Sequence, residues 1–194
     1  TNTIGPILGS RNIIKSLYAA ILGLIFVGLF MILNYRILGL ISVISLVFYG
    51  FFNLAIYSLI PVTLTLPGIA GLILSIGMAV DANILIFERV RDELKNGNTL
   101  IRSIDNGFLR ANSSIIDGHI TTLISCLVLF ILGTNFVKGF SATLGIGVLI
   151  SLFTSLNCSK TFLRFITSYQ SMRRKNLYID NLNLKSSLSN IENQ

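Results

Sequence analysis

The sequence predicts an all-α membrane protein with five transmembrane helices, and three observations support this fold class. Of the 194 residues, 53% are hydrophobic and only 12% are charged, which is about half the charged share of ordinary soluble domains. The hydrophobic residues form runs long enough to cross a bilayer, which takes about 20 residues in a helix. The Lys and Arg residues gather on one side of the resulting topology. A chain with so few charges cannot cover itself with a water-exposed polar surface.

Five apolar runs are predicted to form the spans of a transmembrane bundle over residues 17–168. The last run is longer than a bilayer requires, so one of its ends is expected to protrude or to be non-helical. Short turns at 35–36, 61–63 and 134–135 connect neighbouring spans, and Pro67 suits the first turn of the third helix, where no backbone donor is lost. The five spans cover residues 17–34, 37–60, 64–87, 114–133 and 136–166.

The segments outside the spans are a lead-in, one polar connection and a tail. Residues 1–16 form the lead-in, and residues 169–194 form a tail rich in Asn and Ser that is predicted to be mostly disordered. In the connection, 88–113, the first part continues the third helix over 90–95. Residues 99–110 then show apolar residues at helical spacing, as in a helix on the inner membrane surface or a connecting helix packed on the bundle.

The distribution of basic residues predicts the orientation of the bundle. With a cytoplasmic C-terminus, the inside segments hold 12 Lys and Arg residues and the outside segments hold three, Arg11, Lys15 and Lys138. The connection and the tail are then cytoplasmic, and the lead-in is extracytoplasmic, which implies an upstream span or a missing extracytoplasmic region. Basic segments that face anionic lipid account for the net charge of +7. Membrane lipids are therefore expected as partners, and nucleic acid is not.

Two carboxylates, Asp81 and Asp117, lie inside predicted spans and are the candidate proton-coupling groups. An aspartate at the centre of a membrane helix costs about 2.5–3.5 kcal/mol, and such residues face the bundle interior and mark ion paths. At 1.5 Å per residue, Asp81 lies about 9 Å from the inner end of its helix, and Asp117 lies about 4–5 Å from the same side. Because the two helices run antiparallel, both carboxylates fall in the cytoplasmic half at neighbouring depths.

Small residues near Asp81 predict a tight seam between two helices. Gly77 lies one turn before it, and Gly71, Ser75 and Ala79 add small positions that let helices approach closely in lipid. A protonated aspartate is tolerated in such a place, whereas an ionised one needs water or a cation, so protonation would change helix packing. Moving one charge across 100 mV is worth about 2.3 kcal/mol, which is enough to bias a helix rearrangement.

The polar residues around these carboxylates also have structural explanations. Asp81 could instead cap or bridge helices through Asn83 or Thr122. The hydroxyls of Thr121 and Thr122 either bind a carboxylate or satisfy backbone carbonyls. Asp117 lies near the interface, where a structural capping role is as reasonable as proton exchange. Asn83, Thr121 and Thr122 are therefore supporting polar candidates.

The remaining distinctive residues are expected to pack. His119 projects to a different face from the nearby aspartate and is interpreted as a packed or interfacial histidine. Gly139 and Gly145 fit helix packing. Cys126 and Cys158 have no spacing that favours a metal or redox site, so they are interpreted as small apolar packing residues.

Several short motifs, spread over residues 1–166, match a known pattern. They are TIGP at 3–6 with LG at 8–9, LPGIAG at 66–71, GMAVDAN at 77–83, FER at 87–89, Asp117 with TTL at 121–123, and GT at 133–134 with KGF at 138–140. Together these motifs closely resemble the SecD family of the bacterial protein-export machinery. One departure is at Asp117-Gly118-His119, where that family usually has Asp-Ala-Asn.

The resemblance implies an RND/SecD-type helical bundle. SecD-like proteins have six spans and a large extracytoplasmic domain between the first two, so this chain would be the C-terminal membrane half. The family uses the proton-motive force to help draw secreted proteins across the membrane, and Asp81 matches its aspartate linked to proton movement. The implied partners are SecF, the SecYEG channel and the secreted polypeptide. Protons are the implied coupling ion, without another cofactor, metal or enzymatic activity. The implied location is the inner membrane, or a thylakoid or plastid membrane.

Two other functions are compatible with the residues. An RND-type proton-driven exporter of small molecules or lipids would need its own substrate-binding domain upstream. Substrate-induced proton flux in vesicles, without an effect on protein export, would favour that function. A structural assembly module without proton chemistry would be unaffected by an Asp81→Asn change.

Overall fold

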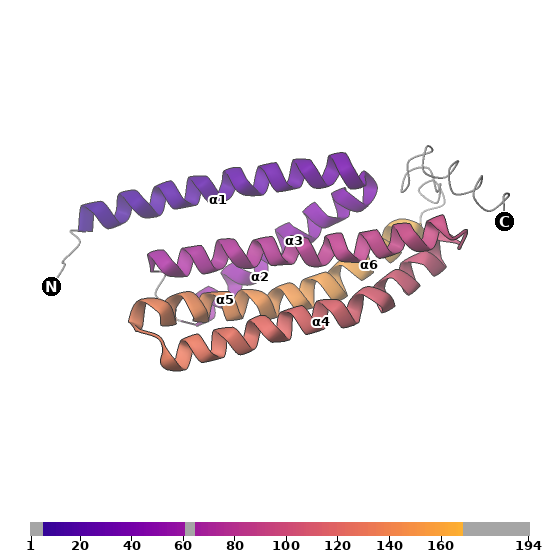
Figure 1. Ribbon diagram of the computed structural model, residues 1–194. Coiled ribbons are helices and arrows are strands. Elements are labelled where there is room, and N and C mark those ends of the chain that lie inside the picture. Colours follow the sequence, from indigo (N-terminus) through magenta and orange to yellow (C-terminus); the bar gives the residue numbers. More distant parts are fainter. Residues whose placement is uncertain (1–5, 61–64, 169–194) are drawn as a thin grey trace.

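The computed structural model describes residues 6–60 and 65–168, which form a helical bundle (Figure 1). Five stretches of the described chain are long and apolar enough to cross a membrane, so the predicted fold class and number of spans are confirmed. The predicted turn at 61–63 and the predicted tail at 169–194 lie outside the described residues. The elements are α1 Pro6–Tyr35, α2 Ile37–Leu59, α3 Leu66–Lys95, α4 Leu100–Leu132, α5 Asn135–Phe153, the π-helical segment η1 Thr154–Cys158, and α6 Ser159–Ser168.

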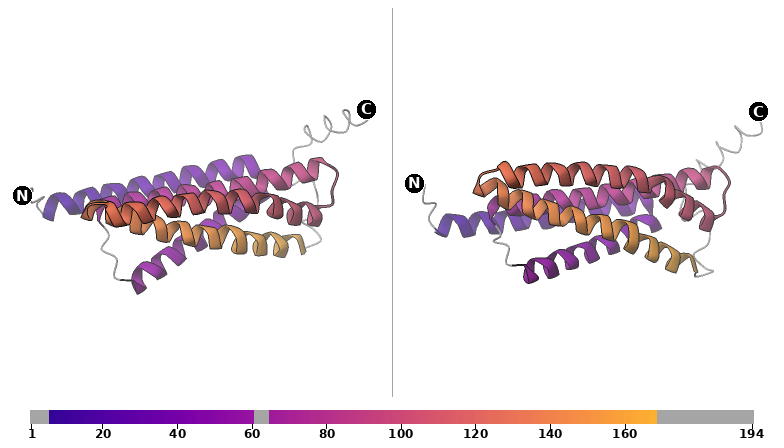
Figure 2. Two further views of the ribbon diagram at one scale, coloured as in Figure 1. Left: turned by 60° about the horizontal axis from the view of Figure 1, so that its bottom comes forward. Right: turned by 90° about the horizontal axis from the view of Figure 1, so that it is seen from below.

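Helices α3, α4 and α5 form the centre of the bundle, where each packs along the other two. Helices α1 and α2 form a hairpin beside this centre, and α1 packs mainly on α2. In both views of Figure 2, α2 runs obliquely, and its C-terminal end diverges from the other helices. Few residues of the candidate span of α1, Ile14–Tyr35, are buried. Its apolar side chains are suited to contact lipid or another protein.

The first helix boundaries follow local chemistry. Helix α1 begins at Pro6, inside the predicted lead-in, rather than at residue 17. Thr65 caps α3, because its hydroxyl accepts a hydrogen bond from the Gly68 amide at 3.2 Å. Pro67 lies in the first turn of α3, as predicted. After α3, Gly97 has φ +85°, a left-handed conformation that glycine adopts without a steric penalty and that stops the helix.

The structure is helical through most of the predicted connection over 88–113. Helix α3 continues to Lys95, as predicted for 90–95, and α4 begins at Leu100. The helix predicted over 99–110 is therefore present, but it is not a separate helix. It is the first part of the fourth span's own helix, and only residues 96–99 connect α3 and α4.

A buried carboxylate holds this helical hairpin together. Glu93 is 2% exposed, and its Oε2 accepts hydrogen bonds from the side-chain amides of Asn98 at 2.7 Å and Asn106 at 3.3 Å. Its Oε1 lies 2.8 Å from the guanidinium of Arg110. A buried charge needs such partners, and these lie on the connection and on α4. The pairing explains why charged residues here extend the helices instead of forming an irregular segment.

The fifth span is helical throughout, although its hydrogen-bonding pattern changes. Neither end of this span is non-helical, and a π-helical turn, η1, lies between α5 and α6. Around it the Thr154 hydroxyl donates to the Ile150 carbonyl at 2.9 Å, and the Ser159 hydroxyl donates to Asn83 Oδ1 at 2.7 Å. Serine and threonine hydroxyls that bind backbone or neighbouring helices make such irregular turns tolerable in a membrane.

Helices α3 and α5 approach each other closely at two glycines. A Cβ added at Gly71 would lie 2.6 Å from Thr143 Oγ1 and 2.7 Å from the Phe140 carbonyl oxygen. A Cβ added at Gly139 would lie 2.8 Å from Thr65 Oγ1. The Thr143 hydroxyl also donates to the Gly68 carbonyl at 2.9 Å across the seam. The predicted packing roles of Gly71 and Gly139 are therefore confirmed.

Other predicted packing residues behave less uniformly. A Cβ added at Gly145 would make an ordinary contact with Cys126 Cβ at 3.7 Å. Cys126 is buried in an apolar cluster with Leu144 and Val148, and both cysteines are free thiols. The interpretation of Cys126 as a packing residue is confirmed.

Candidate functional site

A cavity of about 210 Å³ opens between α3 and α4 around the first candidate aspartate. The lining residues of α3 are spaced i, i+3, i+4 and i+7 and those of α4 are spaced i, i+1, i+4 and i+5, so each set forms one face of its helix. Because Asp81 and the α4 residues 114–119 line one cavity, they lie at the same depth in the bundle, as the antiparallel arrangement predicts. The lining residues are Met78, Asp81, Ala82 and Leu85 from α3, and Ser114, Ile115, Gly118 and His119 from α4.

The side chain of Asp81 is exposed and has no hydrogen-bond or ion-pair partner among the described residues. Asn83 and Thr122, the residues through which Asp81 could have bridged helices, do not contact it. Asn83 is buried and accepts from the Ser159 hydroxyl, and the Thr122 hydroxyl donates to the Gly118 carbonyl at 2.9 Å. Within the described chain, Asp81 therefore does not bridge two helices. It is a carboxylate at membrane depth that is open to one side of the bundle.

The predicted tight seam at Asp81 is wrong within the described chain. A Cβ added at Gly77 would meet nothing within 4 Å, so this glycine and Asp81 share an uncovered face. The physical reason is helix geometry: at 3.6 residues per turn, Gly77 points about 120° away from Gly71. The close seam with α5 uses the face of Gly71 and Ser75, both of which are buried.

His119 lies on the opposite wall of the cavity and joins α4 to α5. It is 7% exposed, its Nδ1 lies 2.8 Å from the Ile115 carbonyl oxygen, and its Nε2 lies 3.1 Å from Ser151 Oγ. Because a carbonyl only accepts, Nδ1 donates, and the Ser151 hydroxyl can donate to or accept from Nε2. The interpretation of His119 as packed and facing away from Asp117 is confirmed.

Sequence reasoning did not bring His119 together with Asp81. The two residues are 38 positions apart on different helices, so no local spacing relates them. The available signal was their shared depth in an antiparallel pair of helices.

Asp117 lies beside the cavity and does not line it. Its side chain is exposed, and the Ser113 hydroxyl donates to Oδ2 at 3.5 Å, a long contact. The Thr121 hydroxyl donates to the backbone carbonyls of Asp117 at 2.7 Å and of Gly118 at 3.0 Å. Together with Thr122, it therefore satisfies backbone and binds no carboxylate. Asp117, Thr121 and Ser125 are all exposed and leave a polar strip on the outer side of α4.

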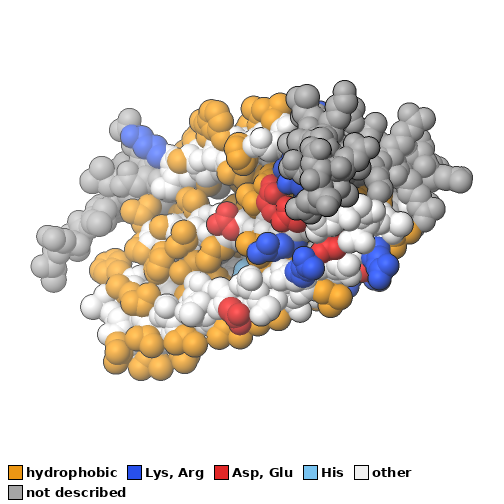
Figure 3. Space-filling view, turned by 45° about the vertical axis from the view of Figure 1, so that its right-hand side comes forward, with side chains coloured by type: hydrophobic (Ala, Val, Ile, Leu, Met, Phe, Trp, Pro, Cys, Tyr) orange, Lys and Arg blue, Asp and Glu red, His pale blue; other side chains and the backbone are white. Residues whose placement is uncertain are grey.

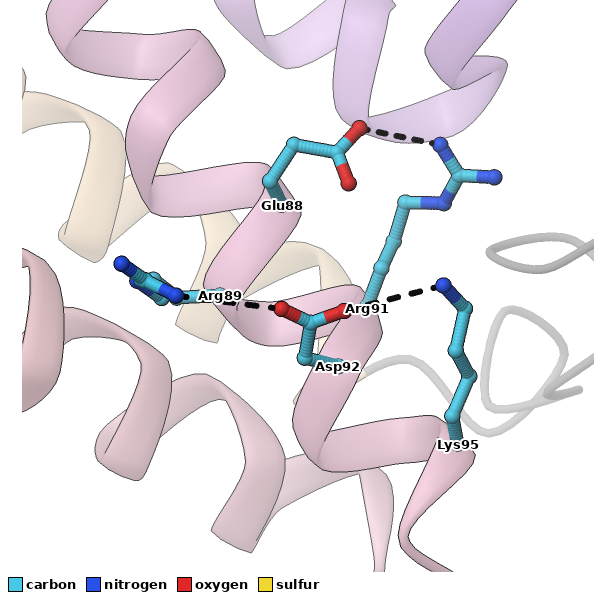
Figure 4. A network of polar contacts seen from close by, with 5 residues as sticks. All are labelled: Glu88, Arg89, Arg91, Asp92 and Lys95. Carbon is cyan, nitrogen blue, oxygen red and sulfur yellow. Dashed lines mark hydrogen bonds and ion pairs between the residues drawn. The ribbon is translucent and has the colours of Figure 1, made fainter.

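The basic residues near the end of α3 are paired with acids of the same helix, as Figure 4 shows. Arg91 lies 3.1 Å from Glu88, and Asp92 lies 4.0 Å from Arg89 and 3.6 Å from Lys95. Exposed pairs three residues apart add little stability. These basic side chains are therefore paired elsewhere, and no described basic side chain is paired with Asp81. In Figure 3 most charged side chains gather towards one end of the visible face, and hydrophobic side chains dominate elsewhere.

The hydrogen bond between His119 and Ser151 predicts a measurable coupling between α4 and α5. His119→Leu and Ser151→Ala should each lower the free energy of unfolding by about 0.6–1.7 kcal/mol, the range for interhelical hydrogen bonds in membranes. The double variant should lose less than the sum, because both changes remove the same bond. Reversible unfolding in mixed micelles measures all three. Strict additivity would show that the two side chains do not interact.

Within the described chain, the fold and this site define a class: a multi-pass helical membrane protein with an unpaired carboxylate in a lateral cavity, as ion-coupled membrane transport requires. The family model for protein export membrane protein SecD/SecF, C-terminal, matches residues 1–169. The chain belongs to this family, and the resemblance inferred from its motifs is confirmed.

Individual relatives agree with the family. The protein translocase subunit SecD of Prochlorococcus marinus is 64% identical over 187 residues, and that of Synechocystis is 54% identical over 182 residues. These matches cover 96% and 93% of this chain, but only 38% and 39% of the relatives. The crystal structure of SecDF, a translocon-associated membrane protein from Thermus thermophilus, superposes with a TM-score of 0.84 at 36% identity. The match covers 88% of this chain and 24% of the SecDF chain.

Proposed function

We propose that this chain is the C-terminal membrane half of a SecD-type subunit that uses the proton-motive force to assist protein translocation through the Sec channel. Relatives named protein translocase subunit SecD, at 64% and 54% identity, support the export role. The observation that carries the proton role is Asp81, an unpaired carboxylate that lines a cavity at membrane depth. The subunit needs no cofactor other than protons and catalyses no bond-making reaction.

The coupling step follows from the energetics of one carboxyl group. Protonated, Asp81 is neutral and is tolerated beside lipid; ionised, it requires water or a cation from a neighbour. Each change of state therefore favours a different arrangement of α3 and α4 around the cavity. His119 links α4 to α5, and Asn83 links α3 to Ser159 at the π-helical turn. These contacts transmit a shift at the cavity to the last span.

The partners follow from the uncovered polar face. Gly77 and Asp81 on α3, with Asp117, Thr121 and Ser125 on α4, are polar or small positions that no described helix covers. Polar and small residues in a membrane promote association with another helix. SecF, next to the SecYEG channel, covers this face and supplies the cation or water that ionised Asp81 requires. The secreted polypeptide is engaged by parts of the full-length protein outside this chain.

The orientation follows from charge. With 12 basic residues on the inner side against three outside, the C-terminus lies in the cytoplasm. A role in protein export is consistent with the inner (cytoplasmic) membrane, or with a thylakoid or plastid membrane. Asp117, Thr121 and Thr122 support the site by shaping α4 beside the cavity.

Depletion of the full-length protein from its host tests the proposed function. Precursors of secreted proteins should accumulate in the cytoplasm, and collapse of the proton gradient should then slow their export little further. Unchanged precursor export, together with retention of a small molecule or lipid that normal cells expel, would instead establish the RND-type exporter.

A further inference from the structure

A second recess, separate from the aspartate cavity, opens between α4 and the segment from η1 to α6. Its volume is about 270 Å³. Each side contributes apolar and polar side chains to its wall. The lining residues are Phe108, Leu109 and Asn112 from α4, Leu156 and Asn157 from η1, and Lys160 from α6.

The polar side chains of this recess have no hydrogen-bond or ion-pair partners among the described residues. The side-chain amides of Asn112 and Asn157 make no hydrogen bond there, and Lys160 has no acidic partner. The Lys160 ammonium instead lies 5.8 Å from the centre of the Phe108 ring. A cation and two side-chain amides, each able to donate hydrogen bonds, therefore line one opening without a described partner.

Lys160 differs in this respect from most cations at the same end of the bundle. Arg102 also has no described acidic partner, but it does not line the recess. The positive charge of Lys160 is therefore uncompensated in a recess that two side-chain amides also line. The basic residues that do have an acidic partner are Arg89, Arg91, Lys95, Arg110 and Arg164.

The depth of Lys160 places the recess at the level of lipid headgroups. Residues 139–159 form an uncharged stretch of 21 residues between Lys138 and Lys160. At 1.5 Å per residue this stretch is about 31 Å long, which matches the hydrocarbon thickness of a bilayer of about 30 Å. Lys160 is therefore the first charge beyond the hydrocarbon. Leu109 beside it is 70% exposed and is suited to contact acyl chains.

We propose that this recess binds the headgroup phosphate of an anionic phospholipid. The phosphate oxygens accept hydrogen bonds from the Lys160 ammonium and from the amides of Asn112 and Asn157, while Leu109 and Leu156 pack on the first acyl carbons. A net-negative headgroup such as phosphatidylglycerol is favoured over a zwitterionic one, because the recess contributes a cation and no acidic side chain. This site is independent of the aspartate cavity and of its proposed role in proton coupling.

Lipid titration of the full-length protein in a neutral detergent, followed by native mass spectrometry, tests the site. Dioleoylphosphatidylglycerol should bind more tightly than dioleoylphosphatidylcholine. Lys160→Gln should weaken phosphatidylglycerol binding about fivefold, the effect expected for one interfacial cation, whereas Lys160→Arg should retain it. Arg102→Gln is the matched control, because it removes an unpaired cation outside the recess, and it should change binding less than about twofold.

Three results would overturn the proposal. Equal losses in Lys160→Gln and Arg102→Gln would show a diffuse surface potential rather than a site. Displacement of phosphatidylglycerol by an equal concentration of glycerol 3-phosphate would show a site for soluble phosphates. Unchanged binding in both Asn112→Ala and Asn157→Ala, which keep the charge, would show that the recess recognises no phosphate; these two variants also serve if Lys160→Gln fails to fold.

Discussion

Asp81→Asn in the full-length protein is expected to abolish the part of protein translocation that depends on the proton gradient, while the complex still assembles. Asparagine has nearly the same size and lacks only the ionisable proton, so the cavity between α3 and α4 stays filled. The side chain has no partner in the described chain, so the change breaks no hydrogen bond or ion pair there. What is lost is the alternation between a neutral and a charged group, which the proposed coupling requires.

Inverted membrane vesicles that contain the full-length variant, SecF and SecYEG measure this effect as the translocation rate with and without an imposed proton gradient. The ratio of the two rates should fall to one for Asp81→Asn. Asp117→Asn is the matched control: it removes a carboxylate from the adjacent helix, outside the cavity, and should reduce the ratio much less. A normal gradient response in Asp81→Asn would refute the proton role and leave the export role intact.

Gly71→Leu is expected to cause a large loss of stability in the described part of the bundle. Even the first added carbon would lie 2.6 Å from Thr143 Oγ1 and 2.7 Å from the Phe140 carbonyl oxygen. The second of these is backbone and cannot rotate away, so α3 and α5 must separate. Overpacking of this kind costs about 1–3 kcal/mol or more, and the separation also breaks the bond from Thr143 to the Gly68 carbonyl.

Gly77→Leu provides the control on the same helix, because a Cβ there meets nothing within 4 Å. In the isolated protein it should change stability by less than about 0.5 kcal/mol. Unfolding in mixed micelles, monitored by circular dichroism, compares both variants with the parent protein. Equal destabilisation by the two leucines would show that α3 and α5 do not pack closely at Gly71. In the assembled complex, Gly77→Leu should instead weaken association with SecF.

The spans could be predicted from sequence because hydrocarbon imposes a local rule. A helix must bury its own backbone polar groups and present about 20 apolar residues to lipid, so α2, α3 and α5 were recognisable from their runs alone. The continuity of the helix predicted over 99–110 with the fourth span was missed because it depends on a distant contact. Glu93 on α3 is satisfied by Asn106 and Arg110 on α4, and no local pattern shows this pairing.

Only part of the candidate site could be predicted from the sequence. Asp81 stood out because a carboxylate in an apolar run is costly wherever its helix points. Its surroundings were not predictable: the seam expected around Gly77 lies on another face of α3, and His119 came to the cavity from a helix 38 residues further along the chain. The face of a helix that packs against its neighbours is set by tertiary contacts. Hydropathy along the sequence does not show which face that is.

The sequence by itself determined the family, the five membrane helices and the one deep carboxylate, because each rests on residue types whose transfer from water to lipid has a large local free energy. Only the tertiary structure decided which helix faces meet, that Gly71 is crowded and Gly77 open, that His119 shares the cavity of Asp81, and that Lys160 is left unpaired beside two free amides. Those outcomes depend on contacts between residues far apart in the chain, whose energies exist only after the helices have packed.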